Sequence, residues 1–372
     1  MTSLKILVTP LDWGLGHTTR CLSLIDYLIK EGHQVVVAAE GHSAMVLRTN
    51  FPELALLPLK GYRITYSKKR QWFVAKLLTQ VPKILRAISR EYRWLKQQQV
   101  IHHFDAIISD NRYGCFLNKV PSVLLTHQLQ IQTNLGSGAD KLLRLLHYRL
   151  LRNFQQVWIV DTVDGGGLSG KLAHPEVLPP QAKYIGLLSQ FTRFQLSSHL
   201  SSVQDHYILA LLSGPEPMRS QLEHLLLQQM ASLPKQQFIV VAGRPPQNTE
   251  PQLPPNVRYH NQATGRELYQ LIHEAELVIC RSGYSSLMDL ALLHKKALLI
   301  PTPGQSEQEY LARHLKAKMG IIHRSQAAIS LSADLPKVKA APSLSLQTQQ
   351  DLMNIVLNDW LLTLVPESGK QW

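Results

Sequence analysis

The chain alternates short apolar runs with longer amphipathic stretches from one end to the other. Apolar runs of four to six residues bounded by turn residues are typical of buried strands. In the first half, such runs occupy residues 4–9, 34–39, 104–109, 122–126 and 156–160. Segments with helical spacing separate several of them, the first at 18–30. Strands that alternate with helices predict a parallel sheet covered by helices, so we expect an α/β fold.

The same alternation restarts in the second half of the chain. The expected strands are 207–212, 237–242, 257–260, 278–280 and 297–300, with helices expected at 219–232, 264–274 and 284–294. Residues 189–205 are rich in Ser, Gln and His, which is typical of a linker. We therefore predict two Rossmann-like domains, 1–190 and 191–345, and a C-terminal helix and tail, 346–372.

Composition adds an expectation about partners. The 372 residues are enough for two domains of ordinary size. The net charge of +13 favours an anionic partner. Three widely spaced cysteines form no disulfide framework or zinc pattern, which favours a cytoplasmic setting. The sequence predicts no signal peptide, no membrane-spanning helix, no metal and no bound cofactor.

Residues 278–310 read as strand, turn, helix, strand, loop and helix. Ser282 is predicted to cap the first of these helices, and Ser306 with Glu309 has the pattern of a capping box on the second. Helix N-termini at the carboxyl edge of parallel strands carry partial positive charge and unpaired N–H groups. This edge therefore predicts an anion site, most simply for a diphosphate.

Four further polar residues fit a nucleotide at this edge. Ser285 and Asp289 are four residues apart, so they share one helix face. A carboxylate there can accept hydrogen bonds from two adjacent sugar hydroxyls, as in other nucleotide sites. Gln308 and Glu309 open the next helix and are expected to reach the same edge. Simpler roles stay open, with Glu309 closing a capping box and Asp289 as a solvated acid.

The loop after the first expected strand carries a second candidate site. Gly14 and Gly16 are predicted to contact the donor, because glycines allow the backbone to approach a ligand closely. His17 titrates near neutral pH, so it can take a proton from a hydroxyl or from water, although a structural role stays open. Asp110 ends the strand expected at 104–109 and is predicted to lie on the same edge, as an orienter of His17 or an alternative base. The loop lacks the third glycine of a dinucleotide-binding fingerprint.

Two segments combine basic residues with aromatic or leucine residues. Segment 60–99 contains a single acid, Glu91, and segment 141–154 reads KLLRLLHYRLLRNF. Basic amphipathic helices suit an anionic membrane surface, so these segments predict peripheral contact with one. The alternative is two solvated helices that pack on the sheet. No recognised RNA- or DNA-binding motif is present, so a nucleic-acid partner is not expected.

Two motifs carry a resemblance to a known family. Arg281-Ser282-Gly283, Asp289, Pro301 and Gln308-Glu309-Tyr310 resemble the donor-binding segment of UDP-sugar glycosyltransferases of the family 28 type. These enzymes are related to the bacterial peptidoglycan N-acetylglucosaminyltransferase that makes lipid II. The family usually has Glu at the position of Asp289 and Gln at the position of Glu309.

The second motif lies near the N-terminus. Gly14-x-Gly16-His17-x-x-Arg20 resembles the N-terminal loop of the same family and of the UDP-sugar hydrolases of nonulosonate synthesis, where the histidine is a proposed base. His127-Gln128 is similar to the His-Glu-Gln loop of the family, without the acid.

The resemblance implies the GT-B fold, in which two Rossmann-like domains face each other across a cleft and a C-terminal helix crosses back to the first domain. It implies an inverting, metal-independent transferase, with the acceptor on residues 1–190 and a nucleotide sugar, UDP-linked in this family, on residues 191–345. The implied donor contacts include Arg281 and the diphosphate site at Ser282 and Gly283. They also include Ser213 and Gly214 in the loop after strand 207–212, and Asn261 near the base.

Other functions remain open on the same fold. His17 could activate water, which would make the protein a UDP-sugar hydrolase, and an epimerase is a further alternative. A nucleotide-sugar-binding protein without catalytic activity is a third. The resemblance also implies a glycan or lipid acceptor and a cytoplasmic enzyme at the inner membrane surface.

Overall fold

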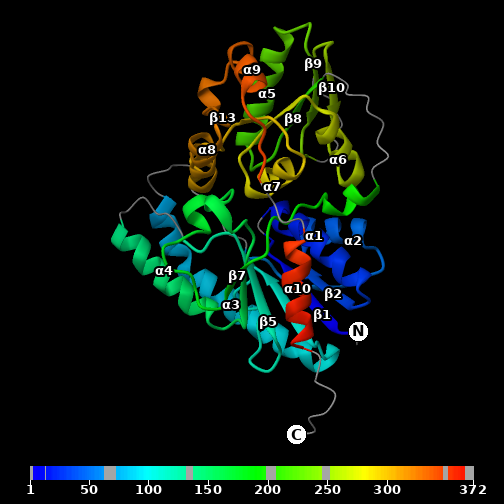
Figure 1. Cartoon of the computed structure of the whole chain (residues 1–372), viewed down its shortest axis with the longest axis vertical. Coiled ribbons are helices and arrows are strands. Elements are labelled where there is room, and N and C mark those ends of the chain that lie inside the picture. Colours follow the sequence, from blue (N-terminus) through cyan, green and yellow to red (C-terminus); the bar gives the residue numbers. More distant parts are fainter. Residues whose placement is uncertain are drawn as a thin grey trace. The chain divides into compact units, whose positions relative to one another are not determined.

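The computed structural model describes residues 3–12, 14–62, 73–130, 137–197, 207–244, 252–346 and 351–364. The chain forms two compact units. Unit 1 comprises Met1–Leu188 and Thr348–Trp372, and unit 2 comprises Ser189–Gln347. Each unit contains a parallel sheet with helices packed on it (Figure 1), as the α/β pattern predicts.

The sheet of unit 1 has the strand order β3-β2-β1-β4-β5-β6-β7, and its neighbouring strands pair in parallel. Pro10 is paired with Asp110, so the segments that follow β1 and β4 begin side by side at one edge. This register brings the loop before His17 next to Asp110. The strands are β1 (Lys5–Pro10), β2 (Gln34–Ala39), β3 (Ala55–Pro58), β4 (Ala106–Asp110), β5 (Ser122–Thr126), β6 (Gln156–Ile159) and β7 (Ala182–Tyr184).

The helices of unit 1 come from the first part of the chain and, in the case of α10, from its C-terminal end. They are α1 (Leu15–Lys30), α2 (Gly41–Asn50), α3 (Phe73–His102), α4 (Ser137–Leu151) and α10 (Leu352–Leu362), with short 3-10 turns η2 (Asp164–Gly166) and η3 (Gly170–Leu172). Helix α1 begins three residues before the predicted 18–30, with Gly14 as its N-cap at φ 78°. His17 therefore lies in the first helical turn rather than in the loop.

The C-terminal helix returns to unit 1, which confirms that part of the predicted fold. Trp360 of α10 is fully buried, and its ring lies edge-on to that of Trp158 with 5.2 Å between ring centroids. Its indole N–H donates to the Gln155 side chain at 3.0 Å. Large buried aromatic pairs contribute strongly to packing, so this contact fixes α10 against the sheet of unit 1 (Figure 1).

The sheet of unit 2 has the order β10-β9-β8-β11-β12-β13. The order reverses between β8 and β11, and ligands of open α/β sheets bind at the carboxyl edge beside such a reversal. Its strands are β8 (Tyr207–Leu211), β9 (Gln237–Val241), β10 (Val257–His260), β11 (Leu277–Cys280), β12 (Ala297–Leu299) and β13 (Ile322–His323). Its helices are α5 (Met218–Ala231), α6 (Gly265–Glu274), α7 (Tyr284–Leu292), α8 (Ser306–Met319) and α9 (Leu331–Ala340), with turns η4 (Thr192–Ser197) and η5 (Gln326–Ala328).

A buried ion pair joins α3 to the loop after β4. Glu91 is the single acid of the basic segment 60–99, and its carboxylate lies 2.9 Å from the Arg112 guanidinium. Tyr62 Oη and the Gly114 N–H also donate to Glu91, at 2.8 and 3.1 Å. Arg112 donates in turn to the carbonyl of Pro10 at 2.8 Å. This network ties α3 to the edge of the sheet where β1 and β4 end.

The sequence pattern missed several short elements. Helix α2, strand β3, strand β13 and helix α9 were not expected. Strand β13 has two residues and α9 contains Pro336, so neither presents a long periodic pattern. Helix α3 continues beyond the basic segment 60–99 to His102, and it contains Pro82. None of the described helices combines the length and apolar character that crossing a membrane requires.

Candidate active site

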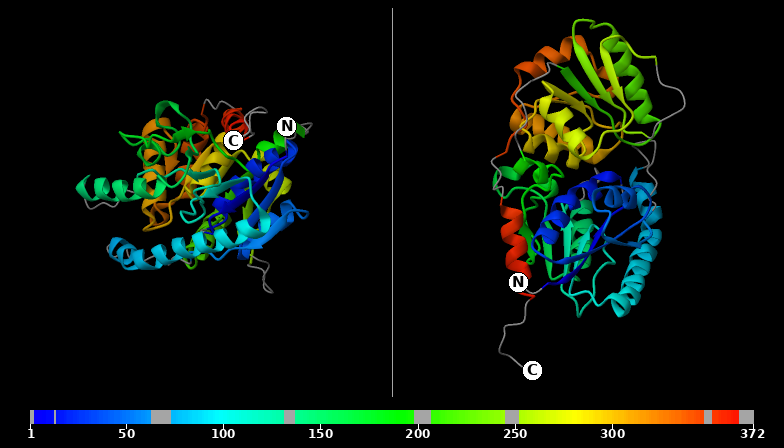
Figure 2. Two further views of the ribbon diagram at one scale, coloured as in Figure 1. Left: turned by 90° about the horizontal axis from the view of Figure 1, so that it is seen from below. Right: turned by 90° about the vertical axis from the view of Figure 1, so that its right-hand side faces the viewer.

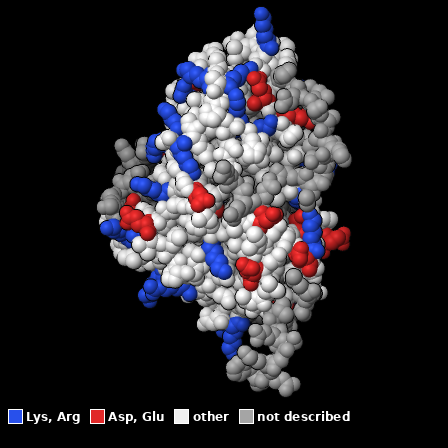
Figure 3. All heavy atoms as spheres, in the orientation of Figure 1, with Lys and Arg blue, Asp and Glu red and all other residues white. Residues whose placement is uncertain are grey.

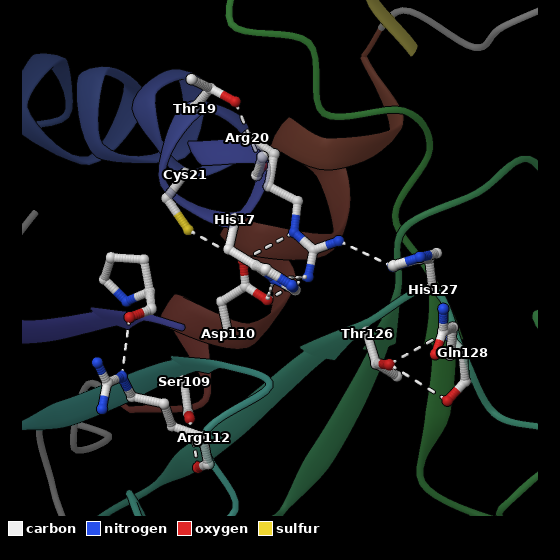
Figure 4. Close-up of polar contacts among 12 residues, drawn as sticks. His17, Thr19, Arg20, Cys21, Ser109, Asp110, Arg112, Thr126, His127 and Gln128 are labelled. Carbon is white, nitrogen blue, oxygen red and sulfur yellow. Dashed lines mark hydrogen bonds and ion pairs between the residues drawn. The ribbon is translucent and has the colours of Figure 1, made fainter. Parts of the chain in front are cut away.

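Four side chains of unit 1 form one hydrogen-bonded cluster at the carboxyl edge of its sheet (Figure 4). His17 and Arg20 come from the first turns of α1, Asp110 ends β4, and His127 follows β5. His17 Nδ1 lies 3.0 Å from Asp110 Oδ1. Arg20 Nε donates to Asp110 Oδ2 at 2.7 Å, and its Nη1 lies 3.0 Å from His127 Nδ1. The predicted pair His17 and Asp110 is thus brought together.

Asp110 is a buried carboxylate that stays ionised. Burial on its own would raise its pKa, but the charges of Arg20 and His17 and their hydrogen bonds outweigh burial and hold the pKa well below the ordinary value. Arg20 is itself 3% exposed, and its second terminal nitrogen also contacts Asp110 Oδ1. Each of the two buried charges therefore has an opposite charge in direct contact.

The ionised Asp110 determines which ring nitrogen of His17 carries the proton. Arg20 Nη2 also lies 2.9 Å from His17 Nδ1, but an N–H donor on Arg20 and a protonated Nδ1 cannot bond each other. A proton on Nδ1 faces the Asp110 carboxylate, which can accept hydrogen bonds from both His17 and Arg20. We therefore assign the proton to Nδ1. Nε2 is then the basic nitrogen, and it has no hydrogen-bond partner among the described residues.

The pKa of His17 lies below its ordinary value of 6.5, mainly because burial disfavours the charged imidazolium. The nearby charge of Arg20 also lowers the pKa, while Asp110 raises it. His17 is therefore neutral at pH 7 and able to accept a proton at Nε2. A histidine oriented by a buried carboxylate in this way is suited to general-base catalysis.

Gly14 and Gly16 have different roles at this site. Gly14 needs its φ of 78°, which side-chain-bearing residues rarely adopt, and an added Cβ would meet nothing within 4 Å. The backbone is thus open to a ligand at Gly14. Gly16 lies inside the first turn of α1, directly before His17.

In unit 2, the predicted helix caps are wrong. Helix α7 has Gly283 as its N-cap, without a side-chain cap. Ser282 Oγ instead donates to the Gln308 carbonyl at 2.8 Å, because Ser282 is buried and faces α8. Helix α8 has Gln305 as its N-cap, and Glu309 accepts from the Gly304 N–H at 3.2 Å instead of closing a capping box.

Helix α6 also begins without a capping box. Thr264 is the N-cap of α6, but its side chain makes no capping hydrogen bond. Glu267 lies 3.2 Å from His260 Nδ1 instead.

Asp289 is buried, so it is not the solvated acid of the simpler interpretation. Ser189 Oγ donates to one carboxylate oxygen at 2.6 Å and Gln190 Nε2 to the other at 3.0 Å. Burial raises the pKa of Asp289 to about 6, although these hydrogen bonds oppose the shift. The Gln190 backbone N–H also bonds to this carboxylate. A carboxylate offers about four acceptor positions, so a position remains for a sugar hydroxyl. Ser285 lies one turn earlier and is partly exposed.

Arg281 contacts protein carbonyls. Its guanidinium donates to the carbonyls of Ile300 and Pro301 at 3.2 Å and of Met218 at 2.9 Å. It is 1% exposed, and burial lowers its pKa to about 10. Arg281 thus holds the loop after β12 and the start of α5 in place beside the predicted diphosphate site.

Ser213 and Gly214 are exposed at the end of β8. The N-terminus of the following helix α5 already faces an acid, because Glu216 accepts from the Ser220 N–H at 3.2 Å and pairs with Arg219. The first turn of α7 contains no acidic residue. Asn261 is partly buried at the end of β10, and its carbonyl accepts from the Arg244 N–H at 3.0 Å.

Sequence reasoning missed how Arg20 and His127 connect the cluster. Both were named only as parts of the family motifs, and no periodic pattern indicates that Arg20 turns inward. The available signal was the spacing of three between His17 and Arg20, which places both on one side of a helix.

The sequence and the fold are similar to those of known glycosyltransferases. Residues 219–350 match the model of the glycosyltransferase family 28 C-terminal domain. An uncharacterized glycosyltransferase of Methanosarcina acetivorans is 22% identical over 327 residues, covering 82% of this chain and 80% of that protein.

Solved structures show the same fold at low identity. The glycotransferase of kitacinnamycin has a TM-score of 0.68 at 14% identity, covering 98% of this chain and 100% of that one. MurG of Acinetobacter baumannii has a TM-score of 0.53 at 13% identity, covering 95% of this chain and 94% of that one.

The chain is an enzyme of the glycosyltransferase class with the GT-B fold. The match of residues 219–350 to the family 28 C-terminal domain model confirms the resemblance to glycosyltransferases of the family 28 type.

Proposed function

We propose that the protein transfers a sugar from a UDP-sugar to a hydroxyl of a glycan or lipid acceptor, with inversion at the anomeric carbon. His17 Nε2 takes the acceptor proton as the acceptor oxygen bonds to the anomeric carbon. The bond from that carbon to the diphosphate breaks, and UDP leaves with the electron pair. The observation that supports this reaction is a neutral His17 held by the ionised Asp110 and free at Nε2.

The donor contacts are proposed on unit 2. The N-terminus of α7 stabilises the leaving diphosphate, a role that a metal ion has in other transferases, so we propose a metal-independent reaction. Asp289 accepts from a ribose hydroxyl, and Gln308 with Glu309 lies where the donor sugar is expected. Ser213, Gly214 and Asn261 complete the proposed donor site at the same edge of the sheet.

We expect UDP to bind more tightly than GDP or dTDP, and Asp289→Ala to weaken UDP binding by about tenfold. The ionised carboxylate is the better acceptor for ribose hydroxyls. Because the pKa of Asp289 is about 6, the ratio of wild-type to Asp289→Asn affinity should rise between pH 5 and pH 7. Isothermal calorimetry at both pH values measures this ratio, and the ionisation of UDP itself cancels in the comparison. Equal binding of all three nucleotides would contradict the UDP assignment.

Several alternatives would use the same candidate residues. A hydrolase would use the same His17 to activate water, and UDP release without an acceptor would identify it. A thymidine nucleotide is the second alternative, because the spinosyn rhamnosyltransferase SpnG, solved with thymidine diphosphate, matches with a TM-score of 0.61 at 14% identity, covering 97% of this chain and 96% of that one. The three-nucleotide calorimetry distinguishes it. An epimerase or a binding protein without activity would leave acceptor-dependent UDP release absent.

We further propose a cytoplasmic enzyme that contacts the inner membrane surface through α4. Leu142, Leu145 and Leu146 are 60%, 66% and 55% exposed on this helix, which is unusual for neighbouring leucines. Lys141, Arg149 and Arg152 are exposed around them. A leucine face with a basic rim is suited to anionic headgroups over an apolar layer.

Helices α3 and α4 extend to the same side of unit 1 (Figure 2). Exposed basic residues of α3 therefore add positive charge on that side, namely Arg86, Arg90, Arg93 and Lys96. Lysine and arginine side chains also lie along the edge that α4 forms (Figure 3). Part of the proposed segment, residues 63–72, lies outside the described residues.

We expect the protein to sediment with vesicles of phosphatidylglycerol and phosphatidylcholine at moderate salt. Replacing Leu145 and Leu146 with serine should reduce the bound fraction several-fold, because it removes buried apolar area. Ile355→Ser is the matched control, since Ile355 is 53% exposed on α10. Equal sedimentation of the Leu145/Leu146 variant and the wild type would contradict the contact through α4.

A further inference from the structure

Unit 2 contains a buried hydroxyl that no group in the described part of the chain satisfies. Thr302 follows β12 and is 4% exposed, and its Oγ1 has no hydrogen-bond partner among the described residues. A buried polar group without a partner destabilises a fold, so such groups in native structures call for a physical reason. A ligand that accepts from the hydroxyl would supply that reason.

The hydroxyl lies between two loops of the proposed donor site. A Cβ built on Gly214 would lie 3.5 Å from Thr302 Oγ1, so the hydroxyl faces the open backbone of Gly214 at the end of β8. Gly214 has φ 107°, a conformation that favours glycine, and it is exposed. The register of the sheet, with Leu211 and Leu299 both paired to Cys280, brings these loops to either side of β11.

A glutamine fixes the orientation of Thr302. The Thr302 N–H donates to Gln308 Oε1 at 2.8 Å, which ties the backbone of the loop to α8. The amide nitrogen of the same glutamine lies 3.9 Å from a Cβ built on Gly283. Gln308 therefore spans the space between Thr302 and the start of α7. Its side-chain N–H groups lie beside the N-terminus of α7.

The α7 N-terminus attracts an anion at this place. The helix spans nine residues, no side chain caps it, and Gly283 leaves its first turn open. Aligned peptide dipoles give a helix N-terminus about half a positive charge. The α5 N-terminus, by contrast, already holds the Glu216 carboxylate. The charge of α7 and the unpaired hydroxyl of Thr302 thus point to one ligand.

We propose that the Thr302 hydroxyl donates a hydrogen bond to a phosphate oxygen of the donor diphosphate, between Gly214 and the N-terminus of α7. This inference rests on the proposed nucleotide-sugar donor and adds a positioning residue to it. The hydroxyl is unpaired without the nucleotide and paired with it. Thr302 thereby contributes to affinity for the diphosphate at a cost in the stability of the free protein.

Thr302→Val tests this proposal, because valine keeps the shape of threonine and removes the hydroxyl. We expect UDP to bind about tenfold or more weakly, the usual effect of losing a hydrogen bond to a charged group. Affinity for uridine, measured by competition, should stay within about twofold of the wild-type value, and Thr302→Ser should restore UDP affinity to within about threefold. The melting temperature of the nucleotide-free Val variant should equal or exceed that of the wild type, since an unpaired polar group is removed.

Thr162→Val is the matched control, because Thr162 also has a buried, unpaired hydroxyl but belongs to unit 1. Its UDP affinity should equal that of the wild type. Unchanged UDP affinity in Thr302→Val would overturn the proposal, as would an equal loss for uridine and UDP. Failure of the wild type to bind any nucleoside diphosphate would overturn the proposed donor itself, and this result differs from the first two.

Discussion

His17→Gln is expected to lower kcat for sugar transfer by on the order of 10²–10⁴-fold while UDP affinity stays within about twofold. Glutamine can still bond to Asp110 but cannot accept the acceptor proton. The nucleotide is proposed to bind unit 2, so its affinity should not depend on a residue of α1. Steady-state kinetics with a UDP-sugar, together with calorimetry on UDP, measure both effects.

Thr19→Ala is the control for this change, because Thr19 belongs to the same turn of α1 and its hydroxyl donates only to the Gly16 carbonyl, at 3.3 Å. It should retain most of the wild-type kcat. The pH profile gives a second readout. Burial places the pKa of His17 below 6.5, so kcat/KM should fall only as the pH drops below that value. A His17→Gln variant with more than about a tenth of wild-type kcat would exclude His17 as the base.

Glu91→Ala is expected to reduce the free energy of unfolding by about 3–5 kcal/mol, the usual result of removing one partner of a buried ion pair. The variant leaves Arg112 fully buried without its carboxylate, and it also removes the acceptor of Tyr62 Oη and of the Gly114 N–H. Urea denaturation followed by circular dichroism measures the change.

Asp26→Ala is the comparison for a surface pair. Asp26 lies 2.7 Å from Lys30 one turn along α1, where both side chains are partly solvated. Exposed pairs of this kind contribute about 0.3–0.5 kcal/mol. A Glu91→Ala variant as stable as Asp26→Ala would show that the Glu91–Arg112 contact does not hold α3 to the sheet.

The sequence predicted the elements whose signal is local. The strands at 34–39, 122–126 and 257–260 have the predicted bounds, because each is a short apolar run between turn residues. The approach of His17 to Asp110 was also predictable, since parallel strands place their carboxyl ends at one edge.

Contacts between distant residues could not be predicted in this way. Ser282 has the residue type and position of a helix cap, yet its hydroxyl bonds to the Gln308 carbonyl on α8. Asp289 has the spacing of an exposed acid, yet it is buried against Ser189 and Gln190. Which partner a polar side chain chooses depends on the packing of elements, and the sequence pattern does not contain that information.

The most direct test of the proposed transfer is UDP release from a panel of UDP-sugars, measured with and without a mixture of glycan and lipid acceptors. The proposed function predicts that acceptors raise the release by wild-type protein and that His17→Gln abolishes this increase. UDP release that is the same without acceptors, or the same in the His17→Gln variant, would contradict it.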